Sequence, residues 1–134
     1  MSLSYRVNVP ITREQFEGIL YASGLAERRP IHDAARLQRM LDHANLTLTT
    51  WDGERLVGIA RALTDWSFCC YVSDLAVDTE YQRQGIGREL IARMQALIGE
   101  EVMLLLVSAP AAMEYYPHIG MEKMERAWYV PRRP

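Results

Sequence analysis

Residues 82–88, Gln-Arg-Gln-Gly-Ile-Gly-Arg, have the composition of a loop that binds phosphate groups. They lie between an apolar strand-like segment and an apolar helical pattern. Free backbone amides and the helix dipole attract anions to the start of a helix. Gly85 and Gly87 lack the Cβ atoms that would obstruct an approaching phosphate oxygen. Arg83 and Arg88 are placed to donate charge-assisted hydrogen bonds. The pattern predicts a pyrophosphate site that uses no metal ion.

Other glycine loops fit these residues less well. A Walker A loop requires Lys and then Ser or Thr after its last glycine, whereas Arg88 and Glu89 follow here. A dinucleotide-binding fingerprint requires a small residue at the position of Leu90, and it directly follows the first strand of its unit. For the two glycines alone, a turn that binds no ligand remains an equal alternative.

The bulk composition is typical of one globular domain over residues 1–134. The chain is 49% hydrophobic and 24% charged, with a net charge of −2. The absence of a basic cluster argues against a nucleic-acid partner, and the absence of an apolar run near 20 residues argues against a membrane partner. Adjacent Cys69 and Cys70 suit neither a relaxed disulfide nor a metal site. We expect both cysteines to be reduced core residues and, because the first ten residues are too polar for a signal peptide, a cytoplasmic protein.

Hydrophobic periodicity and turn residues predict the order β-α-α-β-β-β-α-β-α-β, a mixed α/β domain. Thr12 and Asp33 are candidate helix N-caps, and Asp52-Gly53 is a hairpin turn signal. The expected strands are 5–9, 46–51, 55–63, 68–77, 102–108 and 121–130. The expected helices are 12–24, one that begins near 33, one from the glycine loop to Gly99, and a short one within 111–120.

Two motifs together resemble the GNAT (GCN5-related) N-acetyltransferase family. Gln82-x-x-Gly85-x-Gly87, which follows Asp-Leu-Ala-Val at 74–77, is similar to the acetyl-CoA motif of that family. Met-Glu-Tyr-Tyr-Pro-His-Ile-Gly-Met at 113–121 is similar to its later Phe-Tyr-x-x-x-Gly-Phe segment. The resemblance implies a single GNAT-like α/β domain. Its twisted sheet is mixed and mostly antiparallel, with flanking helices and a splayed parallel strand pair at 68–77 and 102–108.

The resemblance also implies acetyl-CoA as co-substrate and an N-acetyltransferase that acts on a primary amine of a small molecule. A protein N-terminus or lysine is a less favoured acceptor. No metal is implied. The pantetheine arm would enter between the splayed strands, and the glycine loop would hold the pyrophosphate. The implied cofactor-binding residues are Leu75, Ala76, Val77, Gln82, Arg83, Gln84, Gly85, Ile86, Gly87, Arg88 and Ser108.

Two residues are candidates for catalysis. By resemblance Tyr116 donates a proton to the leaving thiolate, and its alternative role is a half-buried core aromatic. Tyr115 is expected to face the other way and to pack. Asp74 either accepts a proton from the amine or is a carboxylate that binds solvent or an arginine. The oxyanion donor is expected to be a backbone N–H in the 75–77 region.

The acceptor and the partners are less determined by the sequence. If Arg28 and Arg29 face the site, they would suit an acceptor with a carboxylate or phosphate, although a solvated turn explains them as well. The apolar C-terminal segment fits either a homodimer contact or a core strand. A non-catalytic acyl-CoA-binding or regulatory module on the same fold is the alternative function, and a dinucleotide-dependent oxidoreductase is a third.

Overall fold

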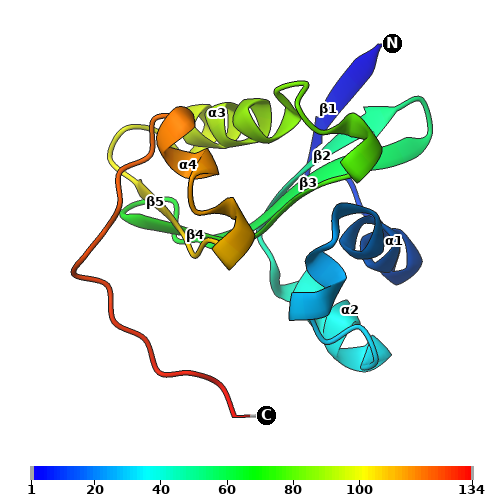
Figure 1. Cartoon of the computed structure of the whole chain (residues 1–134), viewed down its shortest axis with the longest axis horizontal. Helices are drawn as coiled ribbons and strands as arrows, with labels where there is room; N and C mark the ends of the chain where they lie inside the picture. Colours follow the sequence, from blue (N-terminus) through cyan, green and yellow to red (C-terminus); the bar gives the residue numbers. More distant parts are fainter. Residues whose placement is uncertain (1, 134) are drawn as a thin grey trace.

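A computed structural model describes residues 2–133, and it contains five strands and four α-helices in that range (Figure 1). The strands are β1 (Leu3–Val7), β2 (Leu46–Asp52), β3 (Arg55–Thr64), β4 (Cys69–Val77) and β5 (Met103–Leu106). The helices are α1 (Arg13–Ser23), α2 (Ala34–His43), α3 (Ile86–Ile98) and α4 (Tyr115–His118). Short 3-10 turns are η1 (Leu25–Arg28), η2 (Thr79–Tyr81) and η3 (Pro110–Ala112).

The helix ends follow from local capping chemistry. The Thr12 hydroxyl accepts from the Gln15 amide at 3.0 Å, and the Gln15 side chain accepts from the Thr12 amide at 2.9 Å. This capping box satisfies two amides that the first turn of α1 leaves free. Gly24 ends α1 in the left-handed conformation with φ +85°, where a residue without a Cβ is favoured. The sequence predictions at Thr12 and Gly24 are therefore confirmed.

The sheet has the strand order β1-β2-β3-β4-β5. The first three pairings are antiparallel, and β4 pairs with β5 in parallel. The predicted fold class is thus confirmed, including the parallel pair. The chain passes from β4 to β5 through α3, which is the crossover that a parallel pair requires.

Helices cover both faces of this sheet (Figure 1). One apolar cluster packs α3, through Leu90 and Met94, against Leu48, Ala60 and Val72 of the sheet. The second packs α1 and α2 against the opposite face; its buried members are Phe16, Ile19, Leu20, Ala26, Leu37, Ile59 and Ala76. The sheet is therefore the central layer, and the strand ends lie between two helical layers.

Two predictions about the chain are wrong. The expected strand at 121–130 does not form, and the segment after α4 runs away from the sheet without regular structure (Figure 1). A strand needs a paired edge, which β-propensity alone does not supply. Cys70 is a buried core residue, but Cys69 is exposed. Within residues 2–133, none of the helices has the length and apolar character needed to cross a bilayer.

Candidate active site

The central feature of the site is an unpaired edge of β4. β5 pairs with β4 from Cys69 to Val72 and then ends at Leu106. β4 continues for five more residues to Val77, paired only with β3. The segment 73–77 therefore presents main-chain hydrogen-bonding groups on its β5 side to whatever enters there.

A β-bulge in β4 coincides with the start of this unpaired edge. Arg61 of β3 pairs with Asp74, but the next residue, Ala62, pairs with Val72, so Ser73 is the extra residue. The bulge reverses which face the side chains occupy. Val72 packs in the α3 cluster, whereas Ala76 packs against α1 and α2. Without the bulge, these two even-numbered residues would share one face.

The backbone beyond the bulge has a definite orientation. The Asp78 amide donates to the Val57 carbonyl at 2.9 Å. Because antiparallel partners alternate in direction, Ala76 also directs its N–H and C=O toward β3, while Leu75 and Val77 direct theirs toward the unpaired side. Leu75 and Val77 are thus available for main-chain contacts with a ligand, as the resemblance implied. The main chain of Ala76 is occupied by β3.

The glycine loop is anchored from the β2–β3 hairpin. The Arg55 guanidinium donates to Asp78 at 2.9 Å and to Glu80 at 2.6 Å. The Tyr81 hydroxyl donates to Asp52 at 2.6 Å, and the Tyr81 ring is buried. These contacts place residues 82–85 against the end of β4, where α3 begins. Gly85 is the N-cap of α3 with φ +81°, a conformation that strains other residues.

Gln82 and Gly87 make different contacts from those expected. The Gln82 Nε2 atom donates to the Val77 carbonyl at 3.1 Å, so Gln82 satisfies one end of the unpaired edge. A Cβ at Gly87 would lie 2.5 Å from the Tyr115 hydroxyl oxygen and 3.8 Å from Val77 Cγ2. The chain therefore needs a glycine at 87 for Tyr115 as well as for any phosphate. Arg83 lies on the same loop with φ +65°.

The two tyrosines of α4 lie next to each other, and Tyr115 reaches the start of α3. Their rings meet edge to face with centroids 5.2 Å apart, and the Tyr115 hydroxyl contacts the first turn of α3. Tyr115 thus faces the predicted ligand site, contrary to expectation. Burial raises the pKa of Tyr116 above its usual value near 10, and Tyr115 raises it further. Tyr116 therefore remains protonated at neutral pH and can donate a proton.

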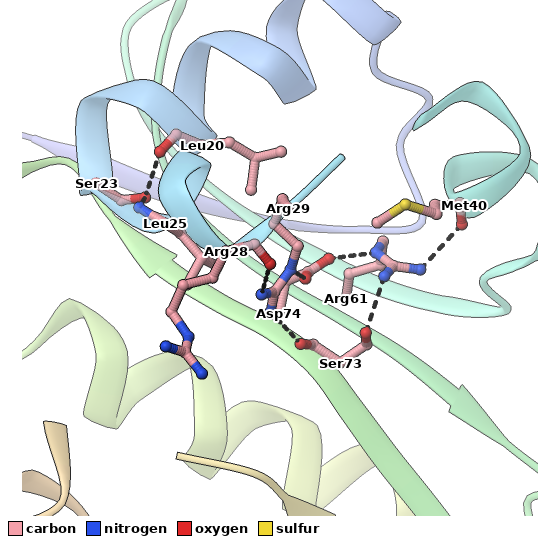
Figure 2. Close-up of polar contacts among 9 residues, drawn as sticks. All are labelled: Leu20, Ser23, Leu25, Arg28, Arg29, Met40, Arg61, Ser73 and Asp74. Carbon is pink, nitrogen blue, oxygen red and sulfur yellow. Dashed lines mark hydrogen bonds and ion pairs between the residues drawn. The ribbon is translucent and has the colours of Figure 1, made fainter. Parts of the chain in front are cut away.

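Asp74 is held by two arginines (Figure 2). Arg29 Nε donates to Asp74 Oδ1 at 2.6 Å, and Arg61 Nε donates to Asp74 Oδ2. The Asp74 side chain is fully buried, and the side chains of Arg61 and Arg29 are 4% and 20% exposed. Both carboxylate oxygens thus accept charged hydrogen bonds. Of the two roles considered for Asp74, this geometry favours the arginine-bound carboxylate over the free base.

The remaining predicted residues are less engaged. Ser108 follows the end of β5, and its hydroxyl donates to the adjacent Ala109 carbonyl at 2.8 Å. Arg28 is exposed, and its side chain extends away from the Asp74 cluster (Figure 2). Trp51 and Arg61 are buried, while Trp66 and Tyr71 are 47% and 39% exposed. Residues 2–133 contain no group of three or more metal-ligating side chains.

A family model settles the class of this domain. The model of the acetyltransferase (GNAT) domain matches residues 14–130. The chain belongs to the GNAT acetyltransferase family. GCN5-related N-acetyltransferase 2, chloroplastic, from Arabidopsis thaliana is 33% identical over 78 residues, which are 53% of this chain and 30% of the relative. The match covers less than a third of the length of this relative and of histone acetyltransferase TAP1 from Glycine max, which is 34% identical over 71 residues.

Solved structures share the fold of this GNAT domain over nearly the whole chain. A probable acetyltransferase from meticillin-resistant Staphylococcus aureus superposes with a TM-score of 0.79 and 22% identity, covering 98% of this chain and all of that one. The aminoglycoside N-acetyltransferase AAC(6')-Iy in complex with CoA gives a TM-score of 0.72 and 17% identity, with 99% and 96% covered. At these identities the likeness establishes the fold alone.

Three features of the candidate site were not predicted from the sequence. The bulge at Ser73, the pairing of Arg29 with Asp74, and the approach of Tyr115 to Gly87 all join residues from different elements. A tyrosine in place of phenylalanine in the Phe-Tyr motif was the one available signal. Its extra hydroxyl requires space or a partner, and Gly87 supplies the space.

Proposed function

We propose that this chain is an acetyl-CoA-dependent N-acetyltransferase acting on a primary amine of a small molecule. The observation that carries the proposal is the unpaired β4 edge beyond Val72, which lies beside the N-terminus of α3 and the tyrosine pair of α4. An extended amide-containing arm fits an unpaired strand edge, and a pyrophosphate fits free helix amides.

The chain's residues have distinct roles in this proposal. Acetyl-CoA supplies the acetyl group as a thioester. The free amides at the start of α3 and the rim arginines Arg83 and Arg88 bind the pyrophosphate. The main chain of Leu75 and the Val77 N–H bind the pantetheine, and the Leu75 N–H is the candidate donor to the oxyanion that forms when the amine attacks. Tyr116 donates a proton to the leaving sulfur.

The fold neighbours support a small-molecule acceptor. Several of the structural neighbours are aminoglycoside acetyltransferases, whose acceptors are small amines by name. Residues 25–29, between α1 and α2, lie beside the bulge in β4 through the Arg29 contacts, so this connection is well placed to meet the acceptor. An acceptor from a protein remains the less favoured possibility.

Thiol release from acetyl-CoA over a panel of primary amines tests the proposal. We expect turnover with at least one small amine, and a large loss of kcat for Tyr116→Phe because only the proton donor is removed. Calorimetry with CoA is the companion measurement. Absence of any heat of binding with CoA or acetyl-CoA would show the assignment to be wrong.

The alternative, a non-catalytic acyl-CoA-binding module, gives a different pattern in the same experiments. Such a module would bind CoA but release no thiol with any amine, and Tyr116→Phe would leave its affinity unchanged. The place of Tyr116 beside Tyr115, which reaches the start of α3, favours the enzyme, because binding alone does not require a proton donor there.

We also propose that two copies pair through the C-terminal segment. Trp128, Tyr129 and Val130 are 94%, 85% and 94% exposed, and the outer edge of β5 has no paired strand within residues 2–133. If residues 126–130 of each copy paired with the outer edge of β5 of the other copy, the exposed side chains and the unpaired edge would both be buried. Sedimentation should show a dimer that Trp128→Ser weakens. A monomer at high micromolar concentration would contradict it.

The location of the protein stays a prediction from its cysteines. Both Cys69 and Cys70 are free thiols, which suits a reducing compartment such as the cytoplasm.

A further inference from the structure

Three charged side chains converge on the bulge in β4 from separate parts of the chain. Arg29 comes from the connection between α1 and α2, Arg61 from β3, and Asp74 from β4 itself (Figure 2). Asp74 is fully buried and Arg61 nearly so. We call Arg29, Arg61 and Asp74 the guanidinium clamp. With two cations and one anion, it carries a net charge of +1.

The clamp also bonds the bulge residue. Arg29 Nη2 donates to the Ser73 carbonyl at 2.8 Å, and Arg61 Nη2 donates to the Ser73 hydroxyl at 3.0 Å. Ser73 has no register partner in β3, and β5 pairing ends one residue earlier. Arg29 therefore bonds the carbonyl of the bulge residue just where the pairing with β5 has ended.

Side chains bond the carbonyls at the two ends of the unpaired β4 edge, but none bonds the main chain at its centre within residues 2–133. Arg29 occupies the Ser73 carbonyl, and Gln82 occupies the Val77 carbonyl. Between them, Leu75 directs its main chain to the same side, and within residues 2–133 no side-chain hydrogen bond reaches it. Leu75 lies two residues beyond the bulge residue, so the direction of its N–H depends on the bulge as well as on the pairing with β3.

Stability alone does not explain such a cluster. Burying charged groups costs desolvation energy that their attraction often only offsets, and apolar residues of similar volume commonly stabilise a protein as well. The cluster instead fixes geometry, because each guanidinium bonds Asp74 and Ser73 with two different nitrogens. A planar guanidinium with several donors imposes directions that a single ammonium does not.

We propose that the guanidinium clamp is a positioning device for acyl transfer: it holds the bulge at Ser73 so that the Leu75 N–H points at the reacting carbonyl. The proposal rests on the proposed function and adds positioning residues to it. Arg61 Nη1 also donates to the Met40 carbonyl at 3.0 Å, so the clamp ties α2 to the same strand. The clamp thereby connects α2, on the proposed acceptor side, with the edge of β4 at which the acetyl group would lie.

Arg29→Lys is the most direct test. Lysine keeps the positive charge beside Asp74, but it cannot bond Asp74 and the Ser73 carbonyl in the same planar geometry. We expect kcat to fall about tenfold or more, because small misplacements of a transition-state donor are costly. The KM for acetyl-CoA and the Kd for CoA should change less than about threefold, since the pyrophosphate binds at α3.

Arg13→Lys is the matched control. Arg13 forms ion pairs with Glu14 and Glu17 at 2.9 and 3.0 Å on the surface of α1, far in sequence from the bulge. The same chemical change there should leave kcat within twofold. Equal kcat for Arg29→Lys and Arg13→Lys, with Arg29→Lys lowering only the melting temperature, would make the clamp merely structural and overturn the proposal.

Amide chemical shifts test the clamp without turnover. In 15N–1H spectra of the free protein, Arg29→Lys should shift residues 73–75 while Ile86 and Gly87 stay in place. Ser73→Ala, which removes only the hydroxyl that Arg61 bonds, should give a smaller shift of the same residues. Unchanged shifts at Leu75 in both variants would refute the proposal. If wild-type protein fails to bind CoA, the proposed function fails, while the amide shifts still decide the clamp.

Discussion

The contact between Gly87 and Tyr115 gives a prediction whose size follows from the structure. A Cβ added at 87 would lie 2.5 Å from the Tyr115 hydroxyl oxygen, closer than non-bonded atoms approach. The next atoms, Tyr115 Cζ and Val77 Cγ2, would lie at 3.4 and 3.8 Å, which is ordinary contact. The clash of Gly87→Ala is therefore with one oxygen atom, and removing that atom should abolish it.

The magnitudes come from two opposing effects. Overpacking of this kind costs about 1–3 kcal/mol, whereas alanine in place of glycine inside a helix gains up to about 1 kcal/mol. We expect Gly87→Ala alone to lower the free energy of unfolding by about 1–2 kcal/mol, or the melting temperature by about 3–6 °C. In the Tyr115→Phe background the same substitution should be neutral or stabilising.

Thermal and urea unfolding of the four proteins of this double-mutant cycle provide the test. Gly18→Ala is the control, since Gly18 is an exposed glycine within α1 whose added Cβ would meet nothing within 4 Å. It should stabilise the domain in either background. An equal loss of stability from Gly87→Ala with tyrosine or phenylalanine at 115 would refute the reasoning.

Calorimetry with CoA on the same proteins distinguishes two reasons why residue 87 is a glycine: space for the Tyr115 hydroxyl and space for a phosphate. If Gly87→Ala with Tyr115→Phe regains stability but binds CoA poorly, an approaching phosphate also needs the missing Cβ. If both stability and affinity return, Tyr115 alone explains Gly87. Gly85 differs from both cases, because its Cβ would meet nothing and only its φ of +81° disfavours other residues.

Three further outcomes are expected. Tyr116→Phe should lower kcat about 10²-fold or more, and wild-type kcat should decline only above pH 10, because burial raises the pKa of Tyr116; an unchanged kcat would contradict its role as donor. The pKa of Asp65 is lowered from 3.8 to about 2 by the amides of Cys69, Phe68 and Ser67. Its contribution to stability is therefore fully present above about pH 4 and lost toward pH 2, so the melting-temperature gap between wild type and Asp65→Ala should close over that range. Because both oxygens of Asp74 are engaged, the acid limb of kcat/KM should follow the pKa of each amine substrate; an acid limb fixed for all amines would instead indicate an enzyme base.

Much of the fold could be predicted because its signals are local. The capping box at Thr12, the left-handed glycine at 24 and the turn at 52–53 each depend on residues within one helical turn or hairpin. The alternation of apolar residues in 46–51 and the helical stripe after the glycine loop likewise concern single elements. Such features do not depend on knowing what packs where, so the element order through β5 follows from them.

The features that the sequence did not predict depend on distant partners. The bulge at Ser73 has no turn residue or glycine to mark it. Arg29 and Asp74 are 45 positions apart, and nothing local distinguishes Arg29 from its exposed neighbour Arg28. The segment 121–130 has the composition of a strand, but a strand requires an edge to pair with. Within residues 2–133 this segment pairs with no strand, although the outer edge of β5 is unpaired.

The fate of Asp74 shows why residue type and position alone do not assign a catalytic role. On the strand that binds the cofactor, a carboxylate is a reasonable base until its neighbours are known. Each of its oxygens accepts a hydrogen bond from a guanidinium group, and its side chain is fully buried. The same contacts hold the bulge that ends the pairing with β5. A residue that accepted the substrate proton would have to leave those arginines and release the strand geometry on which the donor at Leu75 depends. Positioning and proton acceptance are therefore competing tasks at this residue, and the arrangement of the clamp favours positioning.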